Sequence, residues 1–411
     1  MTQHTVRGDN GLVLMTIGVL VLGAGACGGG GSGGGSGGSV GSGGSGGNLA
    51  GSGGTIAGSG GAGGASGSGG SGTGGSGGGA GGSGGGSGGS GGAGDGSVGD
   101  VARDVAADGP PSGLMGGTSG KYICAPGAVY GAPAMMGALT TATGPTFDNG
   151  EGPIWVSATN TLMFTSKLNG GPLRQMWKLV PPAMAPVNVS MSIGNNGMTL
   201  DNDNTIISAD HERSAIVRLN PTTGAFVEVV AGMYMGNRFK SPNDVIVRGD
   251  GNIYFSDPQY FADRGPTPKT ATTAFYRISP PPARTISIVE STGTRDPNGI
   301  ALSADDNTLY TVVTADRVVK KWALNADGSI NGAGMQFAQT GPIPDGMCMD
   351  CAGDLYVATQ NGLEVWSPAG TKLMTIGTNA INCSFGGADH KTLYITSTRV
   401  QWVTMSVPGL P

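Results

Sequence analysis

From about residue 148 to the C-terminus, apolar and polar residues alternate in short runs that end at Asp, Asn or Gly. A period of two predicts β-strands, and neighbouring runs joined by such turns predict β-hairpins. Residues 162–165, 253–256 and 309–313 are examples of the second strand of a hairpin. Because no segment keeps a helical period, the sequence predicts an all-β fold.

One pattern recurs six times in this region: a polar residue, a small or polar residue, and then apolar residues at alternate positions. The six repeats begin at Glu151, Asn196, Asn243, Asn298, Asp345 and Asn382, so successive starts lie 45, 47, 55, 47 and 37 residues apart. This spacing is typical of the blades of a β-propeller. We therefore predict a six-bladed β-propeller over residues 121–411, with a β-sandwich or a pair of β domains as the alternative.

Composition separates the first part of the chain from this region. Residues 28–120 consist almost entirely of Gly, Ser and Ala. Such a segment buries too little apolar surface to offset the entropy of ordering it, so we predict a disordered Gly/Ser-rich linker.

The first 27 residues have the pattern of an export signal. Arg7 precedes an apolar stretch over residues 12–22, and small residues lead into Cys27. This arrangement resembles a lipoprotein-type signal peptide with lipidation at Cys27; an ordinary cleavage site followed by an incidental cysteine is the alternative. We expect an exported protein, anchored by its N-terminal lipid in the membrane of the bacterial envelope (outer membrane or periplasm), or extracellular.

Charge and cysteine content narrow the possible partners. The net charge is −5, and Lys and Arg are scattered without a basic stripe, which argues against nucleic acid as a partner. The three His residues are far apart in sequence, which disfavours a zinc site built from imidazoles. The other four cysteines are Cys124, Cys348, Cys351 and Cys383. They predict one or two disulfides, with the pairing left open, in preference to zinc or redox chemistry at the CxxC formed by Cys348 and Cys351.

The first residues of the six repeats all carry a side-chain oxygen. In a propeller the innermost strand of each blade lines the central channel, so equivalent positions converge at one end of the axis. Oxygen donors suit a hard divalent cation, and two carboxylates would neutralise it. Calcium is the first expectation, with Zn²⁺, Mn²⁺ and Mg²⁺ as alternatives. Each residue on its own also fits a turn or loop cap.

Several segments resemble the gluconolactonase and regucalcin-like family, which includes senescence marker protein and luciferin-regenerating enzyme-like proteins. The resemblance rests on residues 241–258, Asp296-Pro-Asn-Gly, Pro344-Asp-Gly-Met, Phe385-Gly-Gly and Glu151-Gly-Pro-Ile-Trp, and it extends over about residues 148–398. It implies a six-bladed propeller with one catalytic divalent cation, commonly calcium. It also implies hydrolysis of sugar lactones or related esters.

The resemblance also assigns roles residue by residue. It implies that Glu151, Asn298 and Asp345 bind the cation and that Asn243 is a ligand or a substrate contact. Asn196 and Asn382 match less closely and would support the ligands, and Asn196 would also touch the substrate. We expect Asp345 to activate water, in preference to attacking the substrate directly.

His211 matches a substrate-binding position of bacterial members, but Glu212 follows it where the family has Gly. This departure favours a surface position for His211 over a substrate contact.

Two other functions remain compatible with the sequence. The same fold and cation support organophosphate hydrolysis in related propellers, and a non-catalytic binding propeller displayed at the surface is a further possibility. The sequence leaves open which lactone is the substrate and whether the protein forms oligomers.

Overall fold

The computed structural model describes residues 123–125, 127–167, 174–190 and 194–410. The predicted signal peptide, Cys27 and the Gly/Ser-rich linker lie outside these residues. Within the described part of the chain, no helix is both long and apolar enough to span a membrane. The structure here contains strands and one short 3-10 helix, η1 (Ser157–Thr159), which agrees with the all-β prediction.

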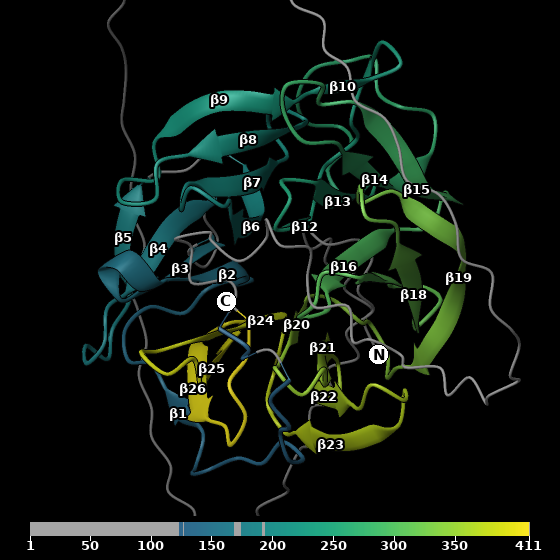
Figure 1. Ribbon diagram of the computed structural model, residues 1–411. Helices are drawn as coiled ribbons and strands as arrows, with labels where there is room; N and C mark the ends of the chain where they lie inside the picture. Colours follow the sequence, from purple (N-terminus) through teal and green to yellow (C-terminus); the bar gives the residue numbers. More distant parts are fainter. Residues whose placement is uncertain (1–122, 126, 168–173, 191–193, 411) are drawn as a thin grey trace, which may run out of the picture. The chain divides into compact units, whose positions relative to one another are not determined.

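Six four-stranded antiparallel sheets surround a central axis (Figure 1). In the first three sheets the strands, from the axis outward, are β2 (Glu151–Val156), β3 (Thr161–Ser166), β4 (Gln175–Leu179) and β5 (Val187–Ser190); β6 (Asn195–Leu200), β7 (Ile206–Asp210), β8 (Ala215–Leu219) and β9 (Phe226–Ala231); and β12 (Val245–Val247), β13 (Ile253–Asp257), β14 (Thr273–Ile278) and β15 (Ile286–Gly293). Each sheet is a sequential meander, because short Asp, Asn and Gly turns join neighbouring antiparallel strands.

The next two sheets repeat this order. They contain β16 (Pro297–Leu302), β17 (Thr308–Val313), β18 (Val318–Leu324) and β19 (Ile330–Gln339); and β20 (Met347–Met349), β21 (Leu355–Thr359), β22 (Gly362–Trp366) and β23 (Lys372–Ile376). A separate two-stranded ribbon, β10 (Met233–Tyr234) and β11 (Asn237–Arg238), follows the second sheet.

The last sheet combines the two ends of the propeller sequence. It contains β24 (Asn382–Gly386), β25 (Thr392–Thr396), β26 (Val400–Thr404) and, as its outermost strand, β1 (Thr140–Thr141). Thr140 lies opposite Trp402 and Thr141 opposite Gln401. The chain segment before the first repeat therefore fastens the last blade to the beginning of the propeller.

The inner strands form a closed ring. Each contacts the inner strand of the next blade, in the order β2, β6, β12, β16, β20 and β24, and β24 contacts β2 again. The six-bladed β-propeller is thus confirmed, and its closure removes the long exposed sheet edges that a sandwich would leave.

Apolar side chains fill the space between neighbouring blades. Phe255 of β13 stacks on Tyr276 of β14 at 5.2 Å between ring centroids, within a cluster that also includes Ile207 of β7. Trp155 of β2 stacks on Tyr394 of β25 at 5.6 Å and so joins the first blade to the last. The Trp155–Tyr394 pair stabilises the contact between these two blades beyond its buried area.

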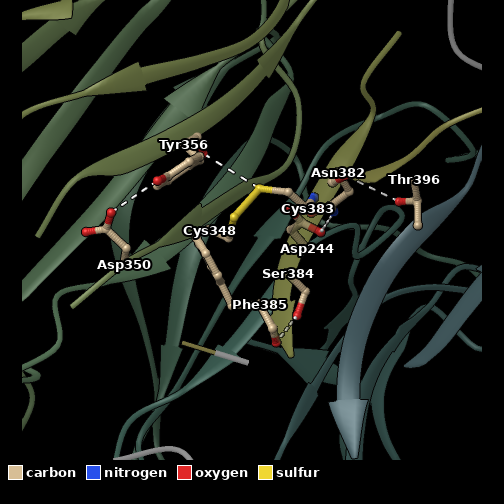
Figure 2. The surroundings of a disulfide bond; sticks show 9 residues. All are labelled: Asp244, Cys348, Asp350, Tyr356, Asn382, Cys383, Ser384, Phe385 and Thr396. Carbon is tan, nitrogen blue, oxygen red and sulfur yellow. Dashed lines mark hydrogen bonds between the residues drawn. A yellow bond between two sulfur atoms is a disulfide. The ribbon is translucent and has the colours of Figure 1, made fainter. Parts of the chain in front are cut away.

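Two disulfides are present, as the cysteine count predicts. They join Cys124 to Cys351 and Cys348 to Cys383. The two cysteines of the CxxC belong to different disulfides, which rules out a shared redox or zinc role for them. The second disulfide links β20 to β24, and Figure 2 shows it beside Asn382 and Asp244. It crosslinks two neighbouring inner strands close to their starts.

Candidate functional site

Glycine follows the first polar residue in four of the six repeats, and the ring explains why. A Cβ at Gly299 would lie 2.1 Å from the carbonyl oxygen of Asp345, in the next blade. A Cβ at Gly346 would lie 2.1 Å from Cγ of Asn382, again in the next blade. Any side chain at Gly299 would push neighbouring inner strands apart, and one at Gly346 would displace the Asn382 side chain. Glycine therefore brings the starts of these strands together.

The six predicted residues sit at equivalent places in the ring, and we call them the axial cluster. Glu151 and Asn382 are the first residues of their strands, Asn196 and Asn298 are the second, and Asn243 and Asp345 lie two residues before theirs. All are buried except Asp345, which is half-buried. Charged and polar groups at this depth need partners to offset their loss of hydration.

Side chains of the axial cluster interact across the axis. The Asn382 side chain lowers the pKa of Glu151, and the Asn298 side chain lowers that of Asp345, so each amide lies close to a carboxyl group. Burial raises the pKa of Glu151 to about 7, although nearby Arg174 opposes the shift. Burial also raises the pKa of Asp345 well above its usual value, and the negative charge of Glu151 adds to this effect. The two carboxyl groups thus share one buried space in which a positive charge would favour their ionised forms.

Three amide oxygens of the axial cluster have no hydrogen-bond partner among the described residues. They are the Oδ1 atoms of Asn196, Asn243 and Asn298, and all three are buried. Asn298 donates through Nδ2 to Thr314 Oγ1 at 3.1 Å and to Tyr260 Oη at 3.4 Å, which leaves its oxygen available. Buried polar atoms without partners are rare and costly, so these oxygens indicate a ligand.

The donors present fit a hard divalent cation. Two carboxylates and several amide oxygens are the groups that calcium prefers, and they supply no sulfur or imidazole. The described residues hold no group of three or more His, Cys, Asp and Glu side chains arranged around a possible metal position. A cation on the axis would therefore depend on the amide oxygens as well as on Glu151 and Asp345.

A third carboxyl group, Asp244, escaped the sequence analysis. It is buried, and it accepts a hydrogen bond from Asn382 Nδ2 at 3.4 Å. Burial and the charge of Glu151 raise its pKa to about 8. Asp244 also lines a cavity of about 60 Å³ between the inner strands. The sequence did hold a signal for it, because Asp244 occupies the repeat position at which four other repeats have glycine.

Arg174 was also missed. It directly precedes β4, is buried, and places Nη2 3.8 Å from Oε1 of Glu151. Its Nη1 donates to the carbonyl oxygen of Asn149 at 3.4 Å. Position 174 lies outside the six repeat starts, so the repeat could not have indicated it.

Comparison with known proteins assigns the fold to a family. Residues 149–399, more than half of the chain, match the family model described as "SMP-30/Gluconolactonase/LRE-like region". The chain belongs to this family. The resemblance that the sequence motifs carried is therefore confirmed, and the protein is a lactonase-family hydrolase related to its characterised members at about 30% identity.

Three similar proteins show how far the sequence and structure of this chain have diverged from those of known proteins. A gluconolactonase of Zymomonas mobilis is 30% identical over 279 residues, covering 60% of this chain and 76% of the relative. The structure of a gluconolactonase from Xanthomonas campestris is 27% identical with a TM-score of 0.57, covering 68% of this chain and 96% of that one. A calcium-binding regucalcin from Agrobacterium tumefaciens, 18% identical with a TM-score of 0.53 over 66% of this chain and 95% of its own, shares the fold.

His211, which precedes the departure from the family motif at Glu212, is not at the surface. It is 1% exposed, and its ring packs 4.6 Å from that of Phe261. Its backbone N–H donates to Gly194 O at 2.9 Å, which holds the turn after β7 inward. Burial lowers the pKa of His211 well below its usual value, with the charge of Arg174 the next largest cause. The expectation of a surface His211 was wrong because packing against Phe261 covers the ring.

Proposed function

We propose that this propeller hydrolyses sugar lactones or related esters with the help of one divalent cation, calcium, on its axis. Glu151, Asn298 and Asp345 would hold the cation, with Asn243 as a further ligand. One observation carries the proposal: the carboxyl groups of Glu151 and Asp345 lie at or near the starts of the inner strands, together with three buried amide oxygens that have no hydrogen-bond partner. The family membership supports the substrate class.

Asp345 carries the proton transfer in this mechanism. A bound divalent cation would polarise the lactone carbonyl and stabilise the developing negative charge. Asp345 takes a proton from the attacking water as its oxygen bonds to the carbonyl carbon. The ring C–O bond then breaks, and the same proton passes to the departing alkoxide, giving the open hydroxy acid.

Neighbouring groups support these roles. Thr314 Oγ1 donates to the carbonyl oxygen of Pro344 at 3.1 Å and accepts from Asn298, so it ties Asn298 to the segment carrying Asp345. Asn243 and Asn196, with buried free amide oxygens, would contact the substrate hydroxyls or the cation. Asn382 donates to Asp244 and lies close to Glu151, whose pKa it lowers.

A lactone assay before and after chelation tests the proposed function. The purified chain should hydrolyse at least one sugar lactone from a panel, lose this activity on chelation, and regain it with calcium. Hydrolysis of a fluorophosphate but of no lactone would instead favour organophosphate chemistry. Absence of turnover across both panels in the presence of calcium would contradict the proposal and favour a binding propeller.

Calcium binding should strengthen as the pH rises. The pKa of Glu151 is about 7 and that of Asp244 about 8 in the folded chain, both above the ordinary values. A carboxyl group with a raised pKa keeps its proton more readily in the folded chain than in the unfolded chain. Its contribution to stability is therefore fully present below the pKa of the unfolded chain and is lost as the pH rises through the pKa of the folded chain. Stability of the cation-free protein should therefore fall between about pH 5 and 8, while calcium affinity rises as protons leave the ligands.

Thermal unfolding at both ends of this pH window, with and without calcium, measures the effect. The calcium-induced rise in Tm should be larger at the higher pH. An equal rise at both pH values would contradict a cation site that includes Glu151.

We also propose that the protein is exported and anchored by a lipid on Cys27. The motif before Cys27 supports this, and two disulfides suit an oxidising compartment. In a bacterial host, the full chain should sediment with membranes, and Cys27→Ala should shift it to the soluble fraction. The same distribution for both proteins would count against the anchor.

A further inference from the structure

Tyr260 reaches the axial cluster from outside the six repeat starts. It lies in the segment between β13 and β14, and its side chain is half-buried. Its hydroxyl oxygen lies 3.1 Å from Thr314 Oγ1 and 3.4 Å from Asn298 Nδ2. No step of the proposed mechanism uses this hydroxyl, although it is a direct neighbour of a proposed cation ligand.

The directions of these hydrogen bonds follow from the hydrogens available. Thr314 Oγ1 donates to the carbonyl oxygen of Pro344 at 3.1 Å, which uses its only hydrogen. Thr314 therefore accepts from both Tyr260 and Asn298. Tyr260 in turn donates to Thr314 and accepts from the second hydrogen of the Asn298 amide.

This arrangement distinguishes the two ends of the Asn298 amide. Nδ2 faces the oxygens of Tyr260 and Thr314, which we call the hydroxyl pair, while Oδ1 is buried without a partner among the described residues. In the reversed orientation, Oδ1 would face the Thr314 oxygen, whose hydrogen is committed to Pro344, and Nδ2 could not bind a cation. The hydroxyl pair therefore selects the orientation that a cation requires.

The Tyr260 hydroxyl keeps its proton beside the carboxyl groups. Burial raises its pKa above the usual value, and the negative charges of Asp345 and Asp296 add to the shift. A neutral phenol donates a hydrogen bond and does not serve as an anionic cation ligand. The contacts of Tyr260 with Thr314 and Asn298 are therefore the ones that matter for the site.

Hydrogen bonds of the preceding residue fix the segment that carries Tyr260. Gln259 N donates to Asp296 Oδ1 at 3.0 Å, and Gln259 Nε2 donates to the carbonyl oxygen of Thr294 at 3.3 Å. Both acceptors lie in the segment that leads into β16, where Asn298 is the second residue. The two segments are thus fastened to each other, which gives the Tyr260 hydroxyl a defined position next to the amide.

We propose that Tyr260 is a positioning residue of the cation site, whose hydroxyl, together with that of Thr314, keeps Asn298 Oδ1 available as a ligand. This inference rests on the proposed function and adds to its site a residue that acts through a ligand. Groups that orient metal ligands in this way typically contribute about 10- to 100-fold to metal affinity. Because Thr314 also bonds to Pro344, the hydroxyl pair relates the position of Asn298 to that of Asp345.

Calcium titration by calorimetry tests this role without depending on turnover. Tyr260→Phe keeps the ring but should weaken calcium binding by about 10- to 100-fold. Thr314→Val has nearly the same shape as the wild type and should weaken binding by a similar factor. Thr314→Ser keeps the hydroxyl, so its Kd should stay within about 3-fold of the wild-type value.

Tyr254→Phe is the matched control. The buried Tyr254 hydroxyl donates to the carbonyl oxygen of Gly328 at 2.5 Å. Gly328 lies in the turn between β18 and β19, at the opposite end of that blade from Asn298. Tyr254→Phe should lower the Tm of the cation-free protein but leave the Kd for calcium unchanged. Comparison with Tyr260→Phe separates a general loss of stability from a loss of ligand orientation.

Turnover at saturating calcium gives a second readout. Because Tyr260 acts through Asn298, enough calcium to fill the site should return kcat of Tyr260→Phe to within about 3-fold of the wild-type value. A loss of turnover that saturating calcium does not restore would overturn the positioning role, because it would place the hydroxyl on the substrate.

The outcomes separate this inference from the proposed function. Calcium binding by Tyr260→Phe as tight as that by the wild type would overturn the role of Tyr260 and leave the lactonase proposal standing. Weakened calcium binding by Tyr260→Phe and Thr314→Val, in a protein that hydrolyses no lactone, would support the role of Tyr260 and count against the lactonase proposal. A wild-type protein that binds no calcium would overturn both.

Discussion

Asp345→Asn is expected to reduce lactone hydrolysis by about 10²- to 10⁴-fold, the range typical for loss of a general base, while the propeller remains folded. Asparagine has nearly the same shape but cannot accept a proton from water. The fold should tolerate the change, since burial already disfavours the charged form of Asp345. Steady-state kinetics on a sugar lactone and thermal unfolding of the same sample measure the two effects.

Asp327→Asn is the control for this variant. Asp327 lies in the exposed turn between β18 and β19, where it accepts a hydrogen bond from Ser329 N at 2.9 Å. Its replacement should change neither activity nor calcium binding. Full activity of Asp345→Asn would eliminate Asp345 as the base, and an unfolded variant would show that its role in stability had been underestimated.

Glu151→Gln is expected to remove the stabilisation by calcium. Loss of a carboxylate ligand should weaken binding at least about 100-fold, because even groups next to ligands contribute about 10- to 100-fold. At a calcium concentration of about 100 times the wild-type Kd, the cation adds about 2.7 kcal/mol to the wild type and would add at most about 0.4 kcal/mol to the variant.

In the cation-free variant two effects oppose each other: buried Arg174 loses its ion-pair partner 3.8 Å away, and two carboxyl groups lose a repelling charge. Glu151 is buried near Asp345 and Asp244, and its charge raises the pKa values of both. A neutral side chain of the same size removes this repulsion. Urea unfolding with and without calcium measures both quantities. A variant that calcium still stabilises as strongly as the wild type would show that Glu151 holds no cation.

The repeat could be predicted from the sequence because each blade satisfies the same local rules. Alternation and turn residues mark the strands, and the polar residue followed by glycine marks the start of an inner strand. The structure gives this pair a physical reason: Gly299 and Gly346 allow the next blade to approach within a distance that any side chain would prevent. Convergence of the axial cluster therefore follows from a pattern visible in the sequence.

Other features depend on contacts between distant segments and could not be predicted. β1 lies before the first repeat and has only two residues, so nothing local indicates that it completes the last blade. The disulfide pairing depends on which blades are neighbours. Arg174 belongs to no repeat position, and the burial of His211 depends on Phe261, 50 positions later in the chain. Departures from a repeat are informative too, since Asp244 replaces a glycine and adds a third buried carboxyl group.

A crystal structure of the protein grown with calcium tests the central claim most directly. The account predicts a single anomalous scattering peak on the axis, at about 2.3 to 2.6 Å from side-chain oxygens of Glu151, Asn298 and Asp345. A well-ordered crystal at saturating calcium with no ion bound to these three residues would contradict it.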